Sequence, residues 1–440
     1  MRHVILLGAG GRDFFDFATV FRDDPDVEVV AFTAAQIPGI DDRRFPASLA
    51  GPRYPDGIPI RPEAELAALV ARHDVDEVVL AYSDLSYDQV MHLASEAMAA
   101  GADVRLLGPR RTMLTATRPV VAVCASRTGA GKSQTSRRVC SILRAAGLRV
   151  ALIRHPMPYG DLEAMRVQRF ATLDEIEASH PTIEEREEYE LPVREGLTVW
   201  AGVDYESIVR RAADESDVIV WDGGNNDLPF VRPDLMITVV DPLRPGPEGG
   251  WFPGEVNVRL ADVIVVNKVD AAESDDVDTV LANVSRLAPA ATVIRAASPV
   301  VLADGPDLTG VRVLVVEDGP TITHGGMPFG AGTVAARQAG AVLVDPRPFA
   351  VGSIAATFAR YPHIGPVLPA MGYGDEQLAE LEATIAAVPC DAVVTGTPID
   401  LTRVVRIDRP VRHASYSLVE IGSPTLDDVL APLVERWRSA

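Results

Sequence analysis

The sequence predicts an α/β protein built mainly from parallel β-sheets with helices on both faces. Short runs rich in β-branched residues recur along the whole chain, and amphipathic stretches with helical spacing lie between many of them. Alternation of strand and helix indicates parallel sheets, because neighbouring parallel strands are joined by a crossover that is usually a helix. In addition, a glycine-rich loop joins one of these strands to the helix that follows it.

The bulk composition places the chain among globular proteins. It has 440 residues, 47% of them hydrophobic, which is enough to bury the cores of several domains. Its 62 acidic and 41 basic residues give a net charge of −21. A negative surface of this kind disfavours non-specific binding of nucleic acid, and we attribute it to general solubility.

Cysteine usage and hydropathy favour a soluble protein of a reducing cytoplasm. Cys124, Cys140 and Cys390 have neither the even number of a disulfide framework nor the spacing of a zinc site. The apolar start MRHVILLGAGG leads into glycines without a cleavage site, and no apolar run reaches the ~18 to 20 residues of a membrane span. We therefore expect a cytoplasmic protein without a membrane partner.

The expected elements follow the alternation along the chain. Amphipathic helices are expected at residues 62–73 and 87–100, and the acidic run TIEEREEYE, residues 182–190, is predicted to be a solvated helix. Strands are expected at residues 4–7, 27–32, 77–81, 104–107, 120–123, 150–153, 218–221, 235–240, 263–266 and 311–316.

Two stretches interrupt this pattern and predict domain boundaries. Residues 108–119 are rich in proline, arginine and threonine, and residues 319–332 are too rich in glycine and proline to form a regular element. We therefore expect three parts: a Rossmann-like domain over residues 1–117, a nucleotide domain over residues 118–325, and a smaller C-terminal α/β region over residues 326–440.

The first strand is followed by the beginning of a dinucleotide-type turn. Gly8, Gly10 and Gly11 follow it in VILLGAGGRDF, but Asp13 stands where the third glycine of the fingerprint belongs. An aspartate at the start of the helix would repel a pyrophosphate. A tight turn in which Asp13 caps its helix is the alternative to a bound dinucleotide.

The strongest motif is the phosphate loop in CASRTGAGKS, residues 124–133. Gly131, Lys132 and Ser133 match the pattern G-x-x-x-x-G-K-[ST], with Ser126 in place of the first glycine. Backbone N–H groups in such a loop bind phosphate at a helix N-terminus, and the lysine adds a positive charge. This P-loop NTPase motif predicts ATP or GTP binding by Thr128, Gly129, Ala130, Gly131, Lys132, Ser133 and Gln134.

A magnesium ion is expected beside the loop. The hydroxyl of Ser133 can ligate Mg²⁺ directly, and Asp222, at the end of the strand in VIVWDGGNND, can hold it through water. Asp227 in the same stretch is either a second functional carboxylate or an ordinary loop residue.

The stretch VIVVNKVD predicts a guanine reader. A carboxylate at the end of a strand can accept both hydrogen bonds from N1–H and N2–H₂ of guanine, which adenine lacks. Asp270 would select the base, Asn267 would position the loop, and the stem of Lys268 would lie along the base. The alternative is a solvated turn between strand and helix.

Two further stretches carry candidate residues for an anionic second substrate. Residues 154–172 gather Arg154, His155, Arg166 and Arg169 around proline and glycine, and cations there could stabilise phosphate charge. His324 lies among glycines in THGGMPFGAG, residues 323–332. Ordinary surface charges and a joining loop are the alternatives.

Longer strings resemble a known family. VAVCASRTGAGKSQTSR, RHPMPYGDL, TIEEREEYE, WDGGNND, DPLRPG, NKVD and VVEDGPTITHGG, together with GRDF and FTAAQIPGIDDRR, resemble the cyclic 2,3-diphosphoglycerate synthetase-like family of predicted GTPases over nearly the whole chain. The nucleotide domain resembles the P-loop class of dethiobiotin synthetase, the nickel-chaperone GTPases and the signal-recognition-particle GTPases. That class implies a homodimer, and Arg127 stands where its ATPases carry a signature lysine.

The resemblance implies closure of 2,3-diphosphoglycerate into an intramolecular phosphoanhydride, driven by ATP. Lys132, Asp222 and Arg127 would be catalytic, and Arg154, His155, Arg166, Arg169 and His324 would hold the small phosphorylated metabolite. The guanine-reader motif instead suits a GTPase. Two hypotheses follow: a ligase-type synthetase that makes a new metabolite, and a GTP-dependent switch or chaperone with a protein partner.

Overall fold

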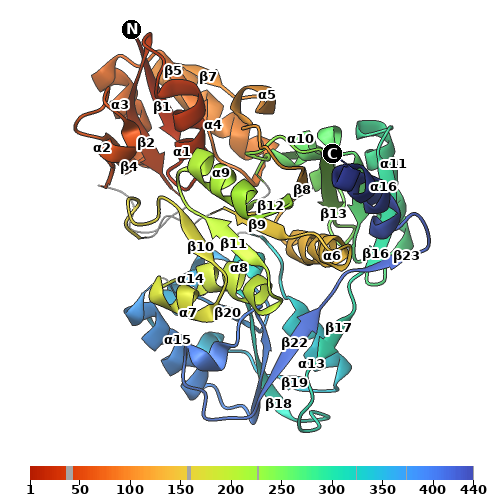
Figure 1. Ribbon diagram of the computed structural model, residues 1–440. Helices are drawn as coiled ribbons and strands as arrows, with labels where there is room; N and C mark the ends of the chain where they lie inside the picture. Colours follow the sequence, from red (N-terminus) through yellow and green to blue (C-terminus); the bar gives the residue numbers. More distant parts are fainter. Residues whose placement is uncertain (36–42, 156–159, 225–226, 324, 373, 440) are drawn as a thin grey trace.

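The computed structural model describes residues 1–35, 43–155, 160–224, 227–323, 325–372 and 374–439. Within them the strands form three mainly parallel sheets and one short ribbon, and helices cover the sheet faces (Figure 1). The predicted α/β class is therefore confirmed.

The first sheet has the order β3-β4-β2-β1-β5-β7, parallel except for β3. Its strands are β1 (Arg2–Leu7), β2 (Val27–Ala34), β3 (Arg44–Phe45), β4 (Ile58–Pro62), β5 (Glu77–Leu80) and β7 (Asp103–Arg105). The helices of this part are α1 (Arg12–Asp16), α2 (Ala47–Ala50), α3 (Leu66–His73), α4 (Tyr87–Ala100) and α5 (Pro109–Thr112).

The second sheet has the order β10-β11-β9-β12-β8-β13-β15-β16-β23, with antiparallel strands at both edges. Its strands are β8 (Val120–Ala125), β9 (Val150–Arg154), β10 (Gln168–Phe170), β11 (Thr198–Ala201), β12 (Val218–Asp222), β13 (Leu235–Val240), β15 (Val263–Val266), β16 (Thr292–Ala297) and β23 (Val419–Ile421). Helices α6 (Lys132–Ala145), α7 (Leu173–Ala178), α8 (Ile183–Arg194), α9 (Tyr205–Glu215), α10 (Gly254–Leu260), α11 (Ser274–Leu287) and α16 (Leu426–Ser439) belong with it.

The third sheet has the order β17-β22-β21-β18-β19, and β20 also pairs with β18. Its strands are β17 (Val300–Leu302), β18 (Arg312–Asp318), β19 (Val342–Leu343), β20 (Leu368–Ala370), β21 (Ala392–Gly396) and β22 (Val411–Tyr416). The accompanying helices are α12 (Gly319–Ile322), α13 (Ala331–Gln338), α14 (Gly352–Arg360) and α15 (Asp375–Ala387).

The sheets correct one expected boundary. The change from the second sheet to the third falls between β16 and β17, well before residue 325. The end of the chain then returns to the second sheet, where β23 pairs with β16 and α16 lies beside α6 (Figure 1). Leu426, Leu430 and Val434 of α16 join the core of that sheet. The C-terminal part is thus an insertion between β16 and β23.

A short ribbon ties the first part to the second. β6 (Leu85–Ser86) pairs with β14 (Trp251–Phe252), and the ring of Phe252 packs against the core of the first sheet. A second contact is made by Phe15 of α1, whose ring stacks on Phe230 with centroids 3.9 Å apart. Two independent contacts therefore fix the first sheet against the second.

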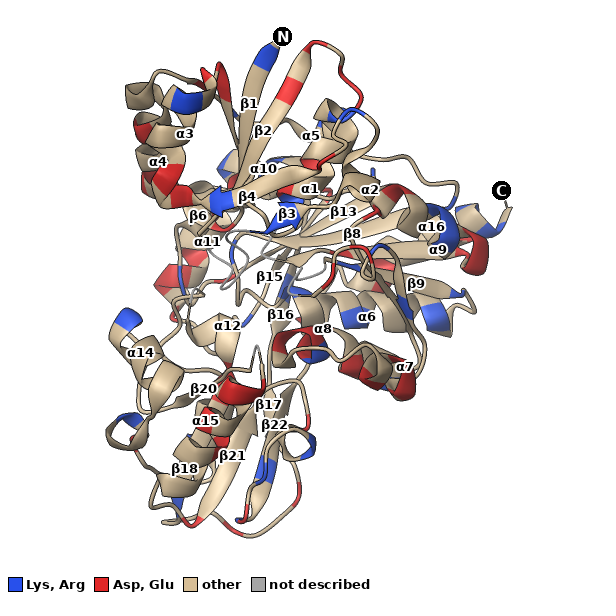
Figure 2. Ribbon diagram, turned by 90° about the vertical axis from the view of Figure 1, so that its left-hand side faces the viewer, with Lys and Arg blue, Asp and Glu red and all other residues tan. Residues whose placement is uncertain are grey.

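Helix α8 corrects a second expectation. Residues 182–190 do form a helix, with Thr182 as its N-cap in a capping box, but Glu184, Glu185 and Glu190 are buried rather than solvated. Figure 2 shows the acidic segments of α7 and α8 beside α6.

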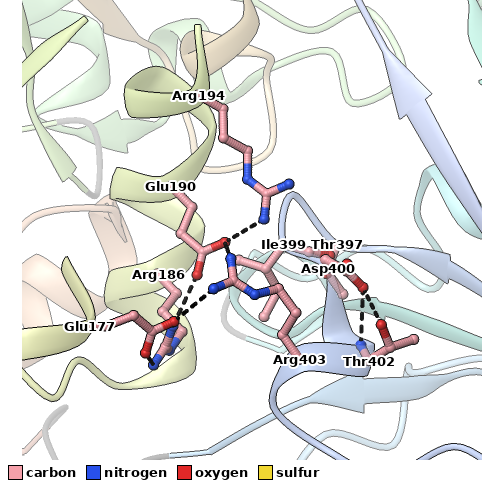
Figure 3. A network of polar contacts seen from close by, with 9 residues as sticks. All are labelled: Glu177, Arg186, Glu190, Arg194, Thr397, Ile399, Asp400, Thr402 and Arg403. Atoms are coloured by element: carbon pink, nitrogen blue, oxygen red, sulfur yellow. Dashed lines mark hydrogen bonds and ion pairs between the residues drawn. The ribbon is translucent and has the colours of Figure 1, made fainter. Parts of the chain in front are cut away.

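An ion-pair network joins α7 and α8 to the third part (Figure 3). Arg186 pairs with Glu177 at 2.7 Å and with Glu190 at 3.0 Å. Arg403 reaches the same two carboxylates, Glu177 at 3.1 Å and Glu190 at 3.9 Å, from the stretch between β21 and β22. Because Glu190 is buried, the network can position α8 against the third sheet.

Candidate functional site

The phosphate loop lies at the carboxyl end of β8, between β12 and β13 in the sheet. Gly129 and Gly131 have φ angles of 84° and 108°, which side chains disfavour. A Cβ on Gly131 would lie 2.1 Å from Nδ2 of Asn267. Helix α6 begins at Lys132, so the loop ends at a helix N-terminus, the geometry that binds phosphate.

Two side chains that directly follow β15 hold this loop. Nδ2 of Asn267 donates to the carbonyl of Ala130 at 2.9 Å, and Nζ of Lys268 donates to the carbonyl of Gly129 at 2.6 Å. Lys268 also pairs with the buried Asp241 at 3.0 Å. Asn267 therefore contacts the loop that it is expected to position. The ammonium of Lys268 also binds the loop, a contact that the sequence did not predict.

Asp270 is exposed and lines the same cavity as the loop. Its carboxylate accepts a hydrogen bond of 3.0 Å from the N–H of Ser298. The hydroxyl of Ser298 donates to Gln134 at 3.2 Å. The structure thus brings Asp270 and Gln134 together through Ser298.

The central charges of the site are Lys132, Asp222 and Arg154. The Asp222 carboxylate pairs with Lys132 through one oxygen and with Arg154 through the other. All three side chains are largely buried. Burial would raise the pKa of Asp222, but the charges of Arg154 and Lys132 hold it below its ordinary value. Asp222 is therefore a carboxylate, as a metal ligand has to be.

Ser133 and Asp222 fit the expected magnesium ion chemically. Both offer oxygen, the donor that Mg²⁺ prefers, and Mg²⁺ commonly takes one or two carboxylates plus phosphate oxygens and water. Among the described residues no group of three or more His, Cys, Asp or Glu could hold a metal by itself. A metal here would need the phosphates of a nucleotide as further ligands.

Residues of the first part and of the ribbon reach the loop. The guanidinium of Arg127 lies 4.2 Å from the ring centroid of Trp251, a cation–π contact of about 0.5 to 2 kcal/mol. Asp84, which follows β5 with a φ of 59°, accepts a 3.2 Å hydrogen bond from the N–H of Thr128. The carboxylate of Asp84 therefore binds a backbone N–H group of the loop that is expected to bind phosphate.

The glycines after β1 do not form an open pyrophosphate site. The Asp13 carboxylate accepts from the N–H groups of Gly10 at 2.9 Å, Gly11 at 3.3 Å and Phe14 at 2.7 Å. A Cβ on Gly11 would lie 2.1 Å from Cε1 of His155, so this glycine permits close packing of the imidazole. The Asp13 carboxylate thus fills the turn, but it is not the expected helix cap: the N-cap of α1 is Gly11, and no side-chain cap hydrogen bond is present.

His155 corrects an expectation about charge. Its Nε2 lies 2.9 Å from the carbonyl of Gly10, and its Nδ1 lies 3.6 Å from Oδ2 of Asp227. Burial lowers the pKa of His155 to about 4, so the ring is neutral at neutral pH and supplies no positive charge to an anionic substrate.

All three parts of the chain enclose one cavity of about 1410 Å³. This exceeds the ~300 to 1,000 Å³ of a typical small-molecule site, so a nucleotide and a second substrate can both be accommodated. The lining carboxylates outnumber the lysines and arginines. They include Glu63 and Asp84 from the first part, Glu187 from α8, and Asp318 at the end of β18.

Glu187 and Asp318 come from different parts and face each other. Burial and the charge of Asp318 raise the pKa of Glu187 well above its ordinary value. Burial likewise raises the pKa of Glu63. A raised pKa shows that no nearby cation offsets the burial of these carboxyl groups. Such carboxyl groups are a feature of sites that receive a cationic group from a ligand.

The remaining candidates are not free to hold an anionic substrate in the cavity. Arg166 donates to the carbonyl of Ser48 at 2.7 Å, and Arg169 pairs with Glu215 at 2.8 Å, so neither lines the site. Arg154 lines it but is committed to Asp222 and Glu188. His324 lies outside the described residues.

Sequence reasoning missed Asp84, Trp251, Glu187 and Asp318. Asp318 is the last residue of β18, a signal that could have found it, and Asp84 lies in the loop that follows β5. Trp251 and Glu187 carry no such signal, because only the tertiary fold brings them to the cavity. No helix in the described part of the chain is long and apolar enough to cross a membrane.

One known protein is similar to this chain over almost the whole length of both. No family model matches the chain. The arginine synthetase ArcE of Thermococcus kodakarensis is 55% identical over 438 residues, which cover 99% of this chain and 97% of that protein.

Two solved structures align weakly. LpxK of Aquifex aeolicus, in complex with ATP, aligns with a TM-score of 0.41 and 14% identity over 74% of this chain and 90% of that one. A DUF1611-family protein of Anabaena variabilis aligns with a TM-score of 0.24 and 12% identity over 67% of this chain and 95% of that one. Both likenesses are too weak to carry an argument.

Proposed function

The chain belongs to the family of the arginine synthetase ArcE and is an enzyme of the synthetase kind, and from this premise we propose that it forms arginine in a reaction driven by a nucleoside triphosphate. The observation that carries the proposal is the cavity. It joins a phosphate loop to a lining in which carboxylates predominate. Such a lining suits a substrate or product with a cationic group.

The chemistry of arginine defines the reaction class. A synthetase has to make a C–N bond at the carbon that becomes the guanidinium carbon. The ureido amino acid citrulline carries an oxygen at the place of that nitrogen, and phosphoryl transfer to this oxygen turns it into a leaving group. Ammonium can then supply the nitrogen, and phosphate and nucleoside diphosphate are released.

The named residues have separate tasks in this proposal. Lys132 and the loop amides bind the β- and γ-phosphates, and Ser133 and Asp222 hold Mg²⁺, which neutralises phosphate charge when bound. Arg127 would stabilise the transferring phosphoryl group. Asp270 would read a guanine, so ATP and GTP are both candidate substrates.

Phosphoanhydride closure of 2,3-diphosphoglycerate is the second chemistry that a phosphoryl-activating loop allows. It needs several cations that are free to hold a polyanion. In the described part of the chain, Arg154 is committed to carboxylates, and Arg166 and Arg169 lie outside the cavity. The acidic lining therefore supports arginine formation better.

A GTP-dependent switch or chaperone is the third alternative. A switch needs no second small-molecule compartment, whereas this cavity extends over three parts of the chain. The test is to incubate the protein with Mg²⁺, citrulline, ammonium and either ATP or GTP. Arginine that appears in step with phosphate supports the proposal. Nucleotide hydrolysis indifferent to citrulline, with no new metabolite, would instead favour the switch.

A further inference from the structure

Asp227 and His155 form a buried polar pair that the nucleotide-binding machinery does not use. The Asp227 residue is only 3% exposed and the His155 side chain 9%. Oδ2 of Asp227 and Nδ1 of His155 are 3.6 Å apart, and neither makes a hydrogen bond within the part of the chain that the structure describes. Buried polar atoms left in this way cost free energy, so a role in the site is the natural explanation.

The pair lies next to the phosphoryl-transfer groups. His155 directly follows Arg154, and Arg154 is the strand partner of Asp222 in the pairing of β9 with β12. His155 and Asp227 line the same cavity as Lys132. The pair and an intermediate held at the phosphate loop would therefore share one cavity.

Several contacts fix the pair. The backbone carbonyl of Asp227 accepts from the thiol of Cys124 at 3.6 Å and from Nδ2 of Asn257 at 3.5 Å. Nearby, Arg12 of α1 donates to the carbonyl of Leu228. Stacking of α1 against the segment after Asp227, through Phe15 and Phe230, holds the same segment from the other side.

We infer that Asp227, supported by His155, accepts the proton of the nitrogen nucleophile in the second half of the reaction. The inference rests on the proposed function, because only C–N bond formation needs this proton transfer. Ammonium has no lone pair and cannot attack carbon until it has lost a proton, so a base close to the loop is required.

Ammonium gives one proton to Oδ2 of Asp227, and the electrons of the broken N–H bond become the lone pair of ammonia. That pair forms the C–N bond at the carbon of the phosphorylated ureido group. The C–O bond to the phosphoryl group breaks, and its electrons leave with phosphate, which takes a proton from the newly bound nitrogen. The products are guanidinium and hydrogen phosphate.

The surroundings give Asp227 the required basicity. Burial raises its pKa to about 8, and the carboxylates of Asp16 and Asp13 add to the rise, whereas Arg12 and a hydrogen bond from Ser83 oppose it. A base of this strength can exchange a proton with ammonium.

The charges around His155 keep its ring neutral. Burial is the main cause of the lowered pKa of His155. The hydrogen bond to Gly10 raises this pKa, whereas the nearby cations Arg154, Lys132 and Arg12 lower it further. A neutral Nδ1 can accept a hydrogen bond from protonated Asp227, which supports the acid once the proton has arrived. Two further titratable groups lie beside Asp227, the buried thiol of Cys124 and the buried hydroxyl of Tyr205. Both remain protonated, because burial raises the pKa of each above its ordinary value.

Hydroxylamine tests the inference, because it is uncharged at neutral pH and needs no base before it attacks. The purified full-length protein receives Mg-ATP, or Mg-GTP if that is the better substrate, with citrulline and either ammonium or hydroxylamine. For Asp227→Asn we expect the ammonium-dependent rate to fall about 100-fold or more, and the hydroxylamine-dependent rate to stay within a few-fold of wild type. Asp234→Asn is the control, since that carboxylate binds the N–H of Val120 and does not line the cavity.

A second variant covers the case in which Asp227→Asn does not fold. His155→Leu should lower the ammonium rate about 10-fold with the same sparing of hydroxylamine, because it removes the acceptor for the Asp227 proton. Equal loss with both nucleophiles in a folded variant, or no loss with ammonium, overturns the inference. A wild-type protein that makes no product with either nucleophile overturns the proposed function, so the two failures are distinguishable.

Discussion

Lys132 at the start of α6 and Asp222 at the end of β12 form an ion pair between a phosphate-binding side chain and a candidate metal ligand. The same carboxylate binds Arg154 through its other oxygen. Phosphate groups entering the loop would compete with Asp222 for Lys132, which frees carboxylate oxygen for a metal. In the proposed function, phosphate binding and metal binding would thus be coupled through one residue pair.

Lys132→Ala should lower nucleotide turnover by about 100-fold or more, because the loop loses the positive charge that we expect on the β- and γ-phosphates. Phosphate release is the measurement. Arg144→Ala is the matched control, since Arg144 lies near the other end of α6 and donates to the carbonyl of Glu195. Turnover unchanged in Lys132→Ala would remove the loop from the mechanism.

Asp270→Ala should raise KM for GTP about 10- to 100-fold and leave KM for ATP unchanged, because only guanine donates two hydrogen bonds to the carboxylate. The measurement is steady-state turnover with each nucleotide. Asp278→Ala, an exposed carboxylate on the neighbouring helix α11, serves as the control. Equal effects on both nucleotides would show that Asp270 does not select the base.

Arg166→Ala and Arg169→Ala should leave KM for citrulline and kcat within about two-fold of wild type, because exposed pairs contribute little and neither side chain lines the cavity. Substrate titrations of both variants check this. A large rise in KM would return these arginines to the substrate site that the sequence suggested.

Asp227→Asn should stabilise the protein at high pH. Folding raises the pKa of Asp227 from 3.8 to about 8, so between these values the folded state keeps a proton that the unfolded state has lost. Stability therefore falls as pH rises through this range. We expect the Tm of the variant to exceed that of wild type by several degrees at about pH 9 and by much less near about pH 4. A difference independent of pH would contradict this.

The contribution of His155 to stability should change with pH in the opposite direction to that of Asp227. Its folded pKa of about 4 lies below the ordinary 6.5, so the unfolded state binds the extra proton between these values. Stability is then lost as the pH falls from about 6.5 to about 4. In His155→Gln the acid limb of the Tm profile should be flatter than in wild type, whereas an identical acid limb would show that the imidazole does not contribute.

Local patterns predicted the fold class and the loop. The run before residue 124 and the glycines after it define β8, the loop and α6, because these are short-range preferences of strand, turn and helix. The structure also brings Asn267 to the loop, as expected from a motif that ends a parallel strand, whereas the contact of Lys268 with Gly129 was not expected. The boundary near residue 325 was wrong because the chain returns to the second sheet only at β23, and no local signal marks that return.

The lining of the cavity could not be predicted, because it depends on contacts between distant parts. The helix at residues 182–190 was expected to be solvated, yet partners such as Arg403 lie more than 200 residues away and cover its carboxylates. Glu187 meets Asp318 for the same reason. His155 was assigned a positive charge from its residue type, whereas burial beneath Gly11 makes it neutral.

The most direct test of the account is to incubate the protein with Mg²⁺, nucleoside triphosphate, citrulline and ammonium labelled with heavy nitrogen, and to analyse the products by mass spectrometry. Arginine carrying one heavy nitrogen, formed in proportion to phosphate release, is the result we predict. Phosphate release without labelled arginine would contradict the account. A product of 2,3-diphosphoglycerate one water lighter, in a parallel incubation with that compound, would then establish the phosphoanhydride synthetase instead.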